Sequence, residues 1–412
     1  MRVLLSTIGS RGDVQPLVAL ASQLRGFGQE VRLCVPPDFQ EWIDSLGFPV
    51  TPIGPEVRKM TAASPPATPA PPSAERRRQL AETSVATQFE TITAAAHSCD
   101  MIVAATALQI AARSVAETMG IPYVFAAYCP NVLPSAHHAP PVLPPVPGQT
   151  PASATADNRE LWARDAERFN DLFGPALNSH RASIGLAPVA DARSHVFTDR
   201  PWLAADPTLA PWPDPADPVV FQPGAWILPD ERPLSPEIET FLDSGEPPVY
   251  FGFGSIMRTP QDLSEVMIRT ARALGRRAIV SRGWADLSLV DNEPDCLAIG
   301  EVNQQALFKR VAAVVHHGGA GTTTAAALAG APQVVIPQWY DQHYFAQRVE
   351  RLGIGTAHAA GTPTAESLTG ALEHTVHSDV AARARSIATA VRRDGAQAAA
   401  QRLINAEHER AG

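Results

Sequence analysis

The sequence predicts an α/β protein made of two doubly wound domains in tandem, each a parallel sheet covered by helices. Short apolar runs alternate with amphipathic stretches along most of the 412 residues, which is typical of strand–helix–strand units. The alternation stops in the proline-rich residues 201–236 and then restarts. Because clustered prolines favour an extended, ordered linker, we expect a first domain over 1–215, a linker over 216–236, a second domain over 237–395 and a final helix over 396–412.

The predicted strands are apolar runs that come before helical patterns. In the first unit, residues 3–6 form a strand, residues 9–12 form a turn, and a helix begins near Asp13 with Pro16 in its first turn. Further strands are expected at 31–35, 101–104 and 123–126 in the first domain, and at 249–253, 278–281, 297–299, 313–316 and 333–336 in the second.

The composition excludes several classes of protein. Hydrophobic residues make up 45% of the chain, charged residues make up 18%, and the net charge is -9. Nucleic acids and anionic membranes demand clustered basic residues, so neither partner is expected. No apolar run reaches the roughly 20 residues that cross a bilayer, and the four cysteines are too scattered for a disulfide framework or a zinc site. We therefore expect a soluble, cytoplasmic protein, and we also expect it to be a monomer.

The strongest motif is a glycine-rich turn between a strand and a helix. An apolar run ends at His316 and His317, four small residues follow, and Thr322 opens a helix. The small residues are Gly318, Gly319, Ala320 and Gly321. Backbone N–H groups and the positive end of the helix dipole make such a turn an anion site that suits phosphate. Successive strand residues point to opposite faces, so one histidine, His316, is expected to face the phosphates. A plain packing turn is the alternative.

The first strand of the second domain ends in Gly252, Gly254 and Ser255. The third glycine of a dinucleotide-binding fingerprint is missing, and the next strand ends in Arg282 rather than in an acid that would hold a ribose. A nicotinamide or flavin dinucleotide is therefore disfavoured. Ser255 either donates to a phosphate or serves only the turn.

Two acidic residues lie beyond the carboxyl ends of strands, where ligands bind in open α/β sheets. Asp341, followed by Gln342, offers the acceptors and amide donors that suit sugar hydroxyls, or it caps the next helix. Asp13, close to Ser10, is either a helix cap or a general base over an acceptor hydroxyl.

Residues 64–72 and 129–151 are rich in proline and interrupt the first domain. They are either plain surface loops or segments that overhang the ligand side of the sheet. In the second case, Tyr128, His137 and His138 would contact a bulky acceptor.

Several catalytic motifs are absent from the sequence. There is no GxSxG nucleophile elbow, no HExxH zinc motif, no phosphate-binding P-loop and no DxD pair. These absences disfavour an α/β-hydrolase, a zinc protease, a P-loop kinase and a metal-dependent transferase. We expect neither a metal nor a resident cofactor.

These segments together resemble one known family. MRVLLSTIGSRGDVQPLVAL at the N-terminus, GAWILPDERPLSPE in the centre, and SRGWADL, EVNQQALF, HHGGAGTT and PQWYDQ further on are similar to the glycosyltransferases of glycopeptide antibiotic (vancomycin-group) biosynthesis. That group belongs to the nucleotide-sugar-dependent family 1 enzymes with the GT-B fold, in which two Rossmann-like domains face each other across a cleft. The resemblance covers nearly the whole chain.

The resemblance implies an inverting, metal-independent transfer of a hexose from a TDP- or UDP-sugar to a hydroxyl of a heptapeptide-type aglycone or its glycosylated intermediate. The first domain would bind the acceptor, with Asp13 as general base beside Ser10, and the second would bind the nucleotide sugar. The final helix would cross back to the first domain. The implied diphosphate contacts are Arg11, Gly12, Ser255, His316, His317 and residues 318–322; Trp284 and Val302 would contact the pyrimidine, and Asp341 and Gln342 the sugar.

The chain departs from the family pattern at two places. Plant relatives carry a glutamate that grips the ribose hydroxyls where this chain has Thr324, which favours a TDP-sugar over a UDP-sugar. Trp339 and Tyr340 stand where relatives often have Met and Ala, so the identity of the sugar stays open. The alternatives are a sterol or lipid glucosyltransferase, a group that usually carries extra membrane-binding modules, and a non-catalytic sugar-nucleotide-binding protein.

Overall fold

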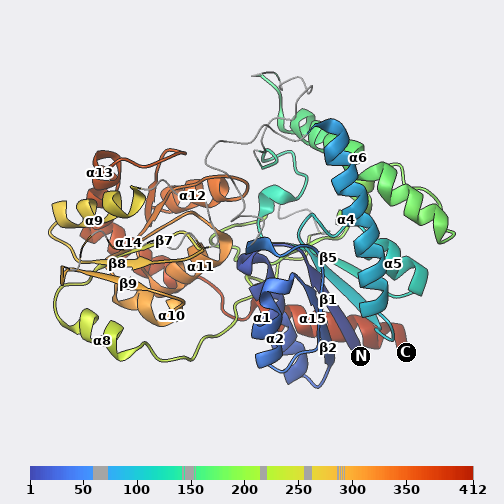
Figure 1. Ribbon diagram of the computed structural model, residues 1–412, viewed down its shortest axis with the longest axis horizontal. Coiled ribbons are helices and arrows are strands. Elements are labelled where there is room, and N and C mark those ends of the chain that lie inside the picture. The colour runs from blue at the N-terminus through green and yellow to red at the C-terminus, as the bar shows by residue number, and fades with distance from the viewer. Residues whose placement is uncertain are drawn as a thin grey trace. The chain divides into compact units, whose positions relative to one another are not determined.

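The computed structural model describes residues 1–58, 73–141, 143, 153, 155–213, 220–254, 262–284, 287, 289, 291 and 293–411. The chain divides into two compact units (Figure 1). Unit 1 comprises Met1–Ala205, Trp212–Leu228 and Arg393–Gly412, and unit 2 comprises Asp206–Pro211 and Pro229–Arg392. The chain therefore passes between the units within residues 205–229 and again at 392–393, whereas the sequence placed a linker at 216–236 and the final helix from 396.

Unit 1 is built on a six-stranded parallel sheet with the strand order β3-β2-β1-β4-β5-β6. Its strands are β1 Arg2–Thr7, β2 Glu30–Val35, β3 Val50–Pro52, β4 Met101–Ala105, β5 Tyr123–Ala127 and β6 Trp202–Leu203. Its helices are α1 Arg11–Gly26, α2 Gln40–Ser45, α4 Ala74–Ala95, α5 Ala112–Met119, α6 Asn158–Ser183, α7 Ala192–Phe197 and α15 Gly395–Ala411, with short 3-10 turns at η1 Pro37–Phe39 and η2 Pro130–Val132. The last helix, α15, packs against α1. The central strands β1 and β4 are almost entirely buried, as expected for a parallel sheet with helices on both faces.

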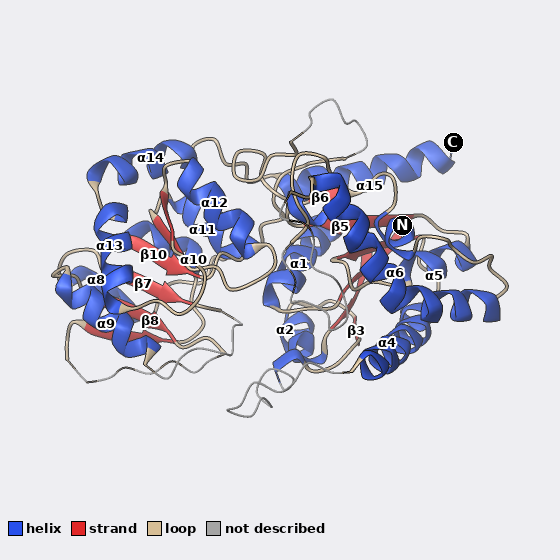
Figure 2. Cartoon of the chain, turned by 90° about the horizontal axis from the view of Figure 1, so that it is seen from above, coloured by secondary structure: helices blue, strands red, loops and turns tan. Residues whose placement is uncertain are grey.

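Unit 2 repeats this plan with the strand order β12-β11-β10-β7-β8-β9. Its strands are β7 Val249–Gly252, β8 Ala278–Ser281, β9 Cys296–Ile299, β10 Ala313–His316, β11 Gln333–Val335 and β12 Gly355–Ala357. Its helices are α8 Pro236–Asp243, α9 Leu263–Ala273, α10 Gln304–Leu307, α11 Ala320–Ala329, α12 Gln342–Arg351, α13 Ala365–Thr375 and α14 Ser378–Ala388, with a 3-10 turn at η3 Phe308–Arg310. Helices flank the strands in each unit (Figure 2). Two parallel-sheet domains confirm the predicted fold class.

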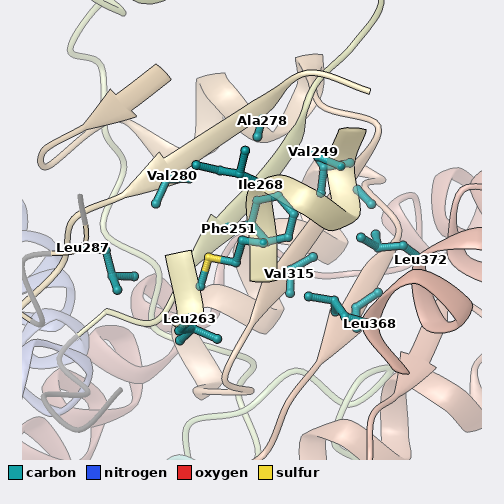
Figure 3. Packing of buried hydrophobic residues seen from close by; sticks show 14 of the residues in the cluster. Val249, Phe251, Leu263, Ile268, Ala278, Val280, Leu287, Val315, Leu368 and Leu372 are labelled. Atoms are coloured by element: carbon teal, nitrogen blue, oxygen red, sulfur yellow. The ribbon is translucent and has the colours of Figure 1, made fainter. Parts of the chain in front are cut away.

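The core of unit 2 lies on both faces of its sheet. Phe251, Val280 and Val315 pack with residues of α9 and α13 on one face (Figure 3). Tyr250 and Val314, one residue earlier in the same strands, pack on the other face. This alternation follows the two-residue period of a strand, and burying each large apolar side chain contributes about 1.5–3 kcal/mol. The packing therefore fixes the register of the strands and the positions of the loops at their ends.

Within the part of the chain that the structure describes, no helix combines the length and the apolar character needed to cross a bilayer.

Candidate active site

The site residues that the sequence predicts in unit 2 follow strands at one edge of the sheet. Strands β11, β10, β7, β8 and β9 are parallel neighbours, so their carboxyl ends meet at the same edge. The loops after them carry, in that order, Asp341 with Gln342, residues 316–322, Ser255, Trp284 and Val302. Ser255 lies outside the described residues. The topology brings the others to one edge of the sheet.

The turn between β10 and α11 leaves backbone donors at the start of the helix. Gly319 is the N-cap, has an extended conformation and makes no side-chain capping bond. The Thr323 N–H donates to the Gly319 carbonyl at 3.0 Å, so the N–H groups of Ala320, Gly321 and Thr322 have no acceptor within the helix. These donors and the positive end of the helix dipole form the anion site that the sequence predicts.

Gly318 determines the shape of this turn. Its φ is +93°, a left-handed conformation that glycine adopts without strain. A Cβ atom on Gly318 would lie 2.7 Å from Val335 Cγ1 and 3.0 Å from the Gln342 carbonyl oxygen. Only glycine therefore lets β10 turn into α11 this close to β11 and α12.

His316 supports the turn from inside unit 2. Its ring is fully buried, with Nε2 2.9 Å from Gln333 Oε1, and Nδ1 accepts the Gly318 N–H at 3.1 Å. The amide of Gln333 also donates to the Thr323 carbonyl at 3.4 Å. Burial lowers the pKa of His316 to about 3, so the ring is neutral and its proton lies on Nε2. Because both nitrogens have partners within the protein, the prediction that His316 faces the phosphates needs correction.

His317 is the histidine that lies against the glycine turn. A Cβ atom on Gly319 would lie 2.6 Å from His317 Nε2, and one on Gly254, after β7, would lie 3.3 Å from its Cε1. Among the described residues, neither ring nitrogen has a hydrogen-bond partner, and Nδ1 is buried. Burial lowers the pKa of His317 to about 4, so its ring is neutral at pH 7. A neutral N–H donor beside an uncapped helix start suits a phosphate oxygen.

The loops after β8 and β9 join the same edge. The Trp284 N–H donates to the Gly254 carbonyl at 2.9 Å, which ties the loop after β8 to the loop after β7. Val302 packs partly buried against the core on one face of the sheet. Asn303 donates to the Asp230 carbonyl at 2.8 Å and caps α10, so it fixes the backbone next to Val302.

Asp341 occupies the N-cap position of α12, but its side chain makes no capping hydrogen bond. The side chain of Asp341 therefore does not serve as a helix cap, which was the alternative role. Gln342 Oε1 accepts the N–H groups of Gln338 at 2.8 Å and of Trp339 at 3.2 Å, which leaves the Gln342 amide nitrogen as the group for a ligand. Tyr340 has a φ of +57°, a strained conformation for a bulky residue. The neighbouring Trp339 side chain is 60% exposed.

In unit 1, Asp13 lies in the first turn of α1, directly after β1. Its Oδ2 accepts the Ser10 N–H at 2.7 Å and the Ser10 hydroxyl at 3.1 Å, as in a capping box. Its Oδ1 has no hydrogen bond to another described residue. Removal from water raises the pKa of Asp13 to about 6, against the lowering effect of the bonds from Ser10. The carboxylate thus caps α1 through one oxygen and keeps the other available for a proton.

Tyr128 holds this turn in place. Its hydroxyl donates to the Asp13 carbonyl at 3.0 Å, and its ring packs edge-on against Trp226 with the centroids 6.2 Å apart. Burial raises the pKa of Tyr128 well above 10, so the hydroxyl stays a neutral donor. In the same turn, the Arg11 guanidinium lies 3.5 Å from the centre of the Trp42 ring, and Gly12 is exposed.

The two histidines expected to contact an acceptor differ in their surroundings. His138 Nε2 lies 2.9 Å from the Leu133 carbonyl, and its ring packs edge-on against Trp162 and Trp212. The Trp162 indole N–H donates to the His138 carbonyl at 2.8 Å, and burial lowers the pKa of His138. This residue therefore anchors its own loop to α6. His137 is exposed.

Gln333, the partner of His316, is a site residue that the sequence pattern does not single out. The side chain is fully buried at the start of β11, between β10 and α11. Its only signal in the sequence is a single amide in the apolar run 331–336. A buried amide needs partners, and here both of its ends are satisfied.

Replacing Gly9 by alanine is expected to reduce turnover about 100-fold, because a 1 Å misplacement of a catalytic group has an effect of that order. A Cβ atom at Gly9 would lie 2.5 Å from Asp13 Cγ, so the carboxylate would have to move. Gly26→Ala at the other end of α1 is the matched control, since nothing lies within 4 Å of its Cβ position. Steady-state kinetics of both variants tests this, and equal rates for the two would contradict it.

Comparisons with known proteins agree with this fold. The model of the glycosyltransferase family 28 N-terminal domain matches residues 3–137, and that of the erythromycin biosynthesis protein CIII-like C-terminal domain matches residues 267–403. The solved glycotransferase of kitacinnamycin superposes with a TM-score of 0.72 at 19% identity over 98% of both chains. VinC, solved in complex with dTDP, superposes with a TM-score of 0.67 at 21% identity over 95% of both chains. The fold and the site define a glycosyltransferase with the GT-B fold.

Curated relatives show to which group of GT-B glycosyltransferases the chain belongs. From Amycolatopsis orientalis, glycosyltransferase GtfE is 52% identical over 99% of this chain and 98% of its own, and vancomycin aglycone glucosyltransferase is 50% identical over 98% of each chain. The dTDP-epi-vancosaminyltransferase of the same organism is 45% identical over 94% of this chain and 93% of its own. The chain belongs to the vancomycin-group glycosyltransferases.

Proposed function

We propose that this enzyme transfers a hexose from a TDP-sugar to a hydroxyl of a heptapeptide-type glycopeptide aglycone or its glycosylated intermediate, with inversion at the anomeric carbon. The proposal is carried by the uncapped turn between β10 and α11 and by the ring of His317 beside it, which has no hydrogen-bond partner among the described residues. The names of the relatives supply the substrates: one acts on the vancomycin aglycone and another transfers a dTDP-linked sugar.

Asp13 acts as the general base. Its Oδ1 takes the proton of the acceptor hydroxyl while the hydroxyl oxygen forms a bond to the anomeric carbon. The bond from that carbon to the diphosphate oxygen breaks on the opposite side, and its electron pair leaves with TDP. With a pKa of about 6, Asp13 is mostly ionised at pH 7.5 and remains basic enough to accept the proton. The raised pKa and the open oxygen support this role over a purely structural one.

The leaving diphosphate gains negative charge as the bond breaks. The N–H groups of Ala320, Gly321 and Thr322 and the ring N–H of His317 are the donors we assign to it, in place of His316. Donors fixed by the fold need little rearrangement during the reaction, which is why they stabilise the transition state effectively.

The residue at position 324 favours a TDP-sugar over a UDP-sugar as donor. Thr324 Oγ1 donates to the Ala320 carbonyl at 2.7 Å, so its hydroxyl is used within α11. The side chain is buried and carries no charge that would hold a ribose 2′-hydroxyl. Asp341, which does not cap α12, and the amide nitrogen of Gln342 are the groups we assign to the sugar hydroxyls.

We further propose that the enzyme works as a cytoplasmic monomer without a resident metal or cofactor. The net charge of -9, with 18% charged residues, supports a freely dissolved protein. In the described part of the chain, no group of three or more His, Cys, Asp or Glu side chains gathers in an arrangement that could hold a metal ion.

Incubation with TDP-glucose or UDP-glucose, a set of heptapeptide aglycones and a sterol, followed by mass spectrometry, tests the proposal. We expect a hexose mass increment on a peptide, a higher rate with the TDP-sugar, and full activity in EDTA. Donor binding without transfer would indicate a non-catalytic binding protein, and an increment on the sterol alone would indicate the lipid alternative. Loss of activity in EDTA that magnesium restores would contradict stabilisation of the diphosphate by protein donors.

A further inference from the structure

Three neighbouring loops of unit 1 meet at the carboxyl edge of its sheet. Strands β1, β4 and β5 are adjacent and parallel, so the loops that follow them lie side by side. They carry Asp13, residues 106–109 and residues 128–131 respectively. The hydrogen bond from Tyr128 to the Asp13 carbonyl joins the third loop directly to the first. The acceptor hydroxyl of the proposed reaction must reach Asp13 at this edge.

Two of these loops hold buried polar atoms that have no partner. Among the described residues, Thr106 Oγ1, Gln109 Nε2 and Asn131 Oδ1 are buried and make no hydrogen bond. The amides of Asn178 and Asn303, in contrast, use both their oxygen and their nitrogen within the protein. Buried polar groups are normally paired with protein or ordered water, so three orphaned atoms on adjacent loops call for a partner that the described residues do not supply.

Of the three residues with orphaned atoms, Asn131 indicates most clearly what kind of group could bind. Its side chain is 6% exposed and lies in η2, three residues after Tyr128. In the described part of the chain, its side chain has no hydrogen bond at either end of the amide. An amide can accept through its oxygen and donate through its nitrogen, so it matches a hydroxyl or a peptide N–H group.

The loop after β4 is also strained and partly apolar. Thr106 has a φ of +73°, which is costly for a β-branched residue and is common at ligand sites. Leu108, two residues further, is 47% exposed. A strained turn with an exposed leucine and buried orphaned polar atoms suits a ligand that is both apolar and rich in hydroxyl and amide groups.

We propose that Asn131 binds the acceptor, pairing its amide with a hydroxyl or peptide N–H group next to the attacking hydroxyl, and that the strained loop of Thr106 lines the same site. This assignment rests on the proposed function and names a specificity residue of the acceptor side that the sequence did not reveal. The matching acceptor chemistry is that of a hydroxylated peptide, because such molecules carry both O–H and N–H groups.

The test compares Asn131→Leu and Asn131→Ala with the wild type. The acceptor KM should rise about tenfold, as expected when a buried hydrogen bond to a ligand is lost. The donor KM, the affinity for TDP and the slow hydrolysis of TDP-glucose by water should stay within about twofold, because these do not involve the acceptor. Asn405→Leu, an exposed amide on α15, serves as the matched control. The melting temperature should not fall, because the Asn131 side chain has no hydrogen-bond partner among the described residues to lose.

The outcomes of this test distinguish acceptor binding by Asn131 from a structural role of Asn131 and from failure of the proposed function. An acceptor KM unchanged within about twofold in both variants would overturn the assignment, as would a parallel loss of hydrolysis or a lower melting temperature, since both would indicate a structural role. If the wild type itself neither bound TDP nor transferred a sugar, the proposed function would fail first and this assignment with it. Unchanged transfer in both variants, in contrast, would remove only the role of Asn131.

Discussion

Replacing Asp13 by asparagine is expected to lower turnover by at least about 100-fold, since a positioned general base contributes roughly 10²–10⁴-fold. Asparagine keeps the size of the side chain and can still accept the N–H of Ser10, so the cap of α1 is retained. It cannot take a proton from the acceptor. Steady-state kinetics with saturating donor measures the effect, and a turnover within about threefold of the wild type would remove Asp13 from the role of base.

Donor binding provides the control for this variant. The hydrogen-bond donors assigned to the diphosphate lie in unit 2, whereas Asp13 lies in unit 1, so the affinity for TDP should be unchanged.

The pH dependence of the rate gives a second check on the Asp13→Asn variant. The base must be deprotonated, so the rate should fall as the pH drops through about 6, the pKa of Asp13. The asparagine variant should lack this acid limb.

The Asp13→Asn substitution should lower turnover but raise thermal stability at alkaline pH. The pKa of Asp13 in the fold is raised above its ordinary value, mainly by burial, so the fold favours the protonated form. The contribution of this carboxyl to stability is therefore largest at low pH and is lost as the pH rises through about 6. The asparagine variant should melt higher than the wild type at pH 8, with a smaller difference at pH 4. Such a gain in stability with a loss of activity is typical of a catalytic group held in an unfavourable environment.

Replacing His317 by alanine is expected to reduce turnover about 10²–10³-fold, the usual effect of removing one preorganised donor to a developing negative charge. The ring lies beside the glycine turn and has no hydrogen-bond partner within the described chain, so its removal leaves no polar group of the protein unsatisfied. Its pKa of about 4 means that it acts as a neutral donor, and its contribution should be constant between pH 6 and 9. Turnover and TDP affinity should both fall while the melting temperature stays close to that of the wild type.

His316→Ala is the matched comparison, because the two histidines are adjacent and have opposite surroundings. Removing His316 leaves Gln333 Oε1 and the Gly318 N–H without partners in a buried region. Each buried group left unsatisfied costs about 1–3 kcal/mol, so this variant should melt well below the wild type. If His316→Ala were stable and His317→Ala unstable, the assignment of the two rings would be reversed.

The sequence was sufficient to predict the two-sheet architecture and the positions of the loops that carry the candidate site residues. Apolar runs mark the buried strands because a parallel sheet is covered on both faces, and the glycine-rich turn after β10 follows from the need for φ values such as that of Gly318. The order of the strands then places Asp341, His317 and Trp284 at one edge. The residue pattern alone predicts the sheets and the placement of these loops, because both depend only on local periodicity and on topology.

The sequence could not decide which side chains are already used by the fold. The two-residue period of a strand gives opposite faces to His316 and His317, but not which face holds a buried partner; Gln333, 17 residues after His316, decides that. His138 looked equally available until the contacts with Trp162 and Trp212 placed it in its own loop. Such partners are set by tertiary packing between distant segments, which a local pattern does not contain.

A crystal structure of the protein with bound TDP tests the central assignment most directly. We expect diphosphate oxygens to lie within about 3 Å of the backbone nitrogens of Ala320, Gly321 and Thr322 and of a ring nitrogen of His317. A turn that stays vacant while TDP binds elsewhere, or a diphosphate held only by charged side chains of other loops, would contradict it.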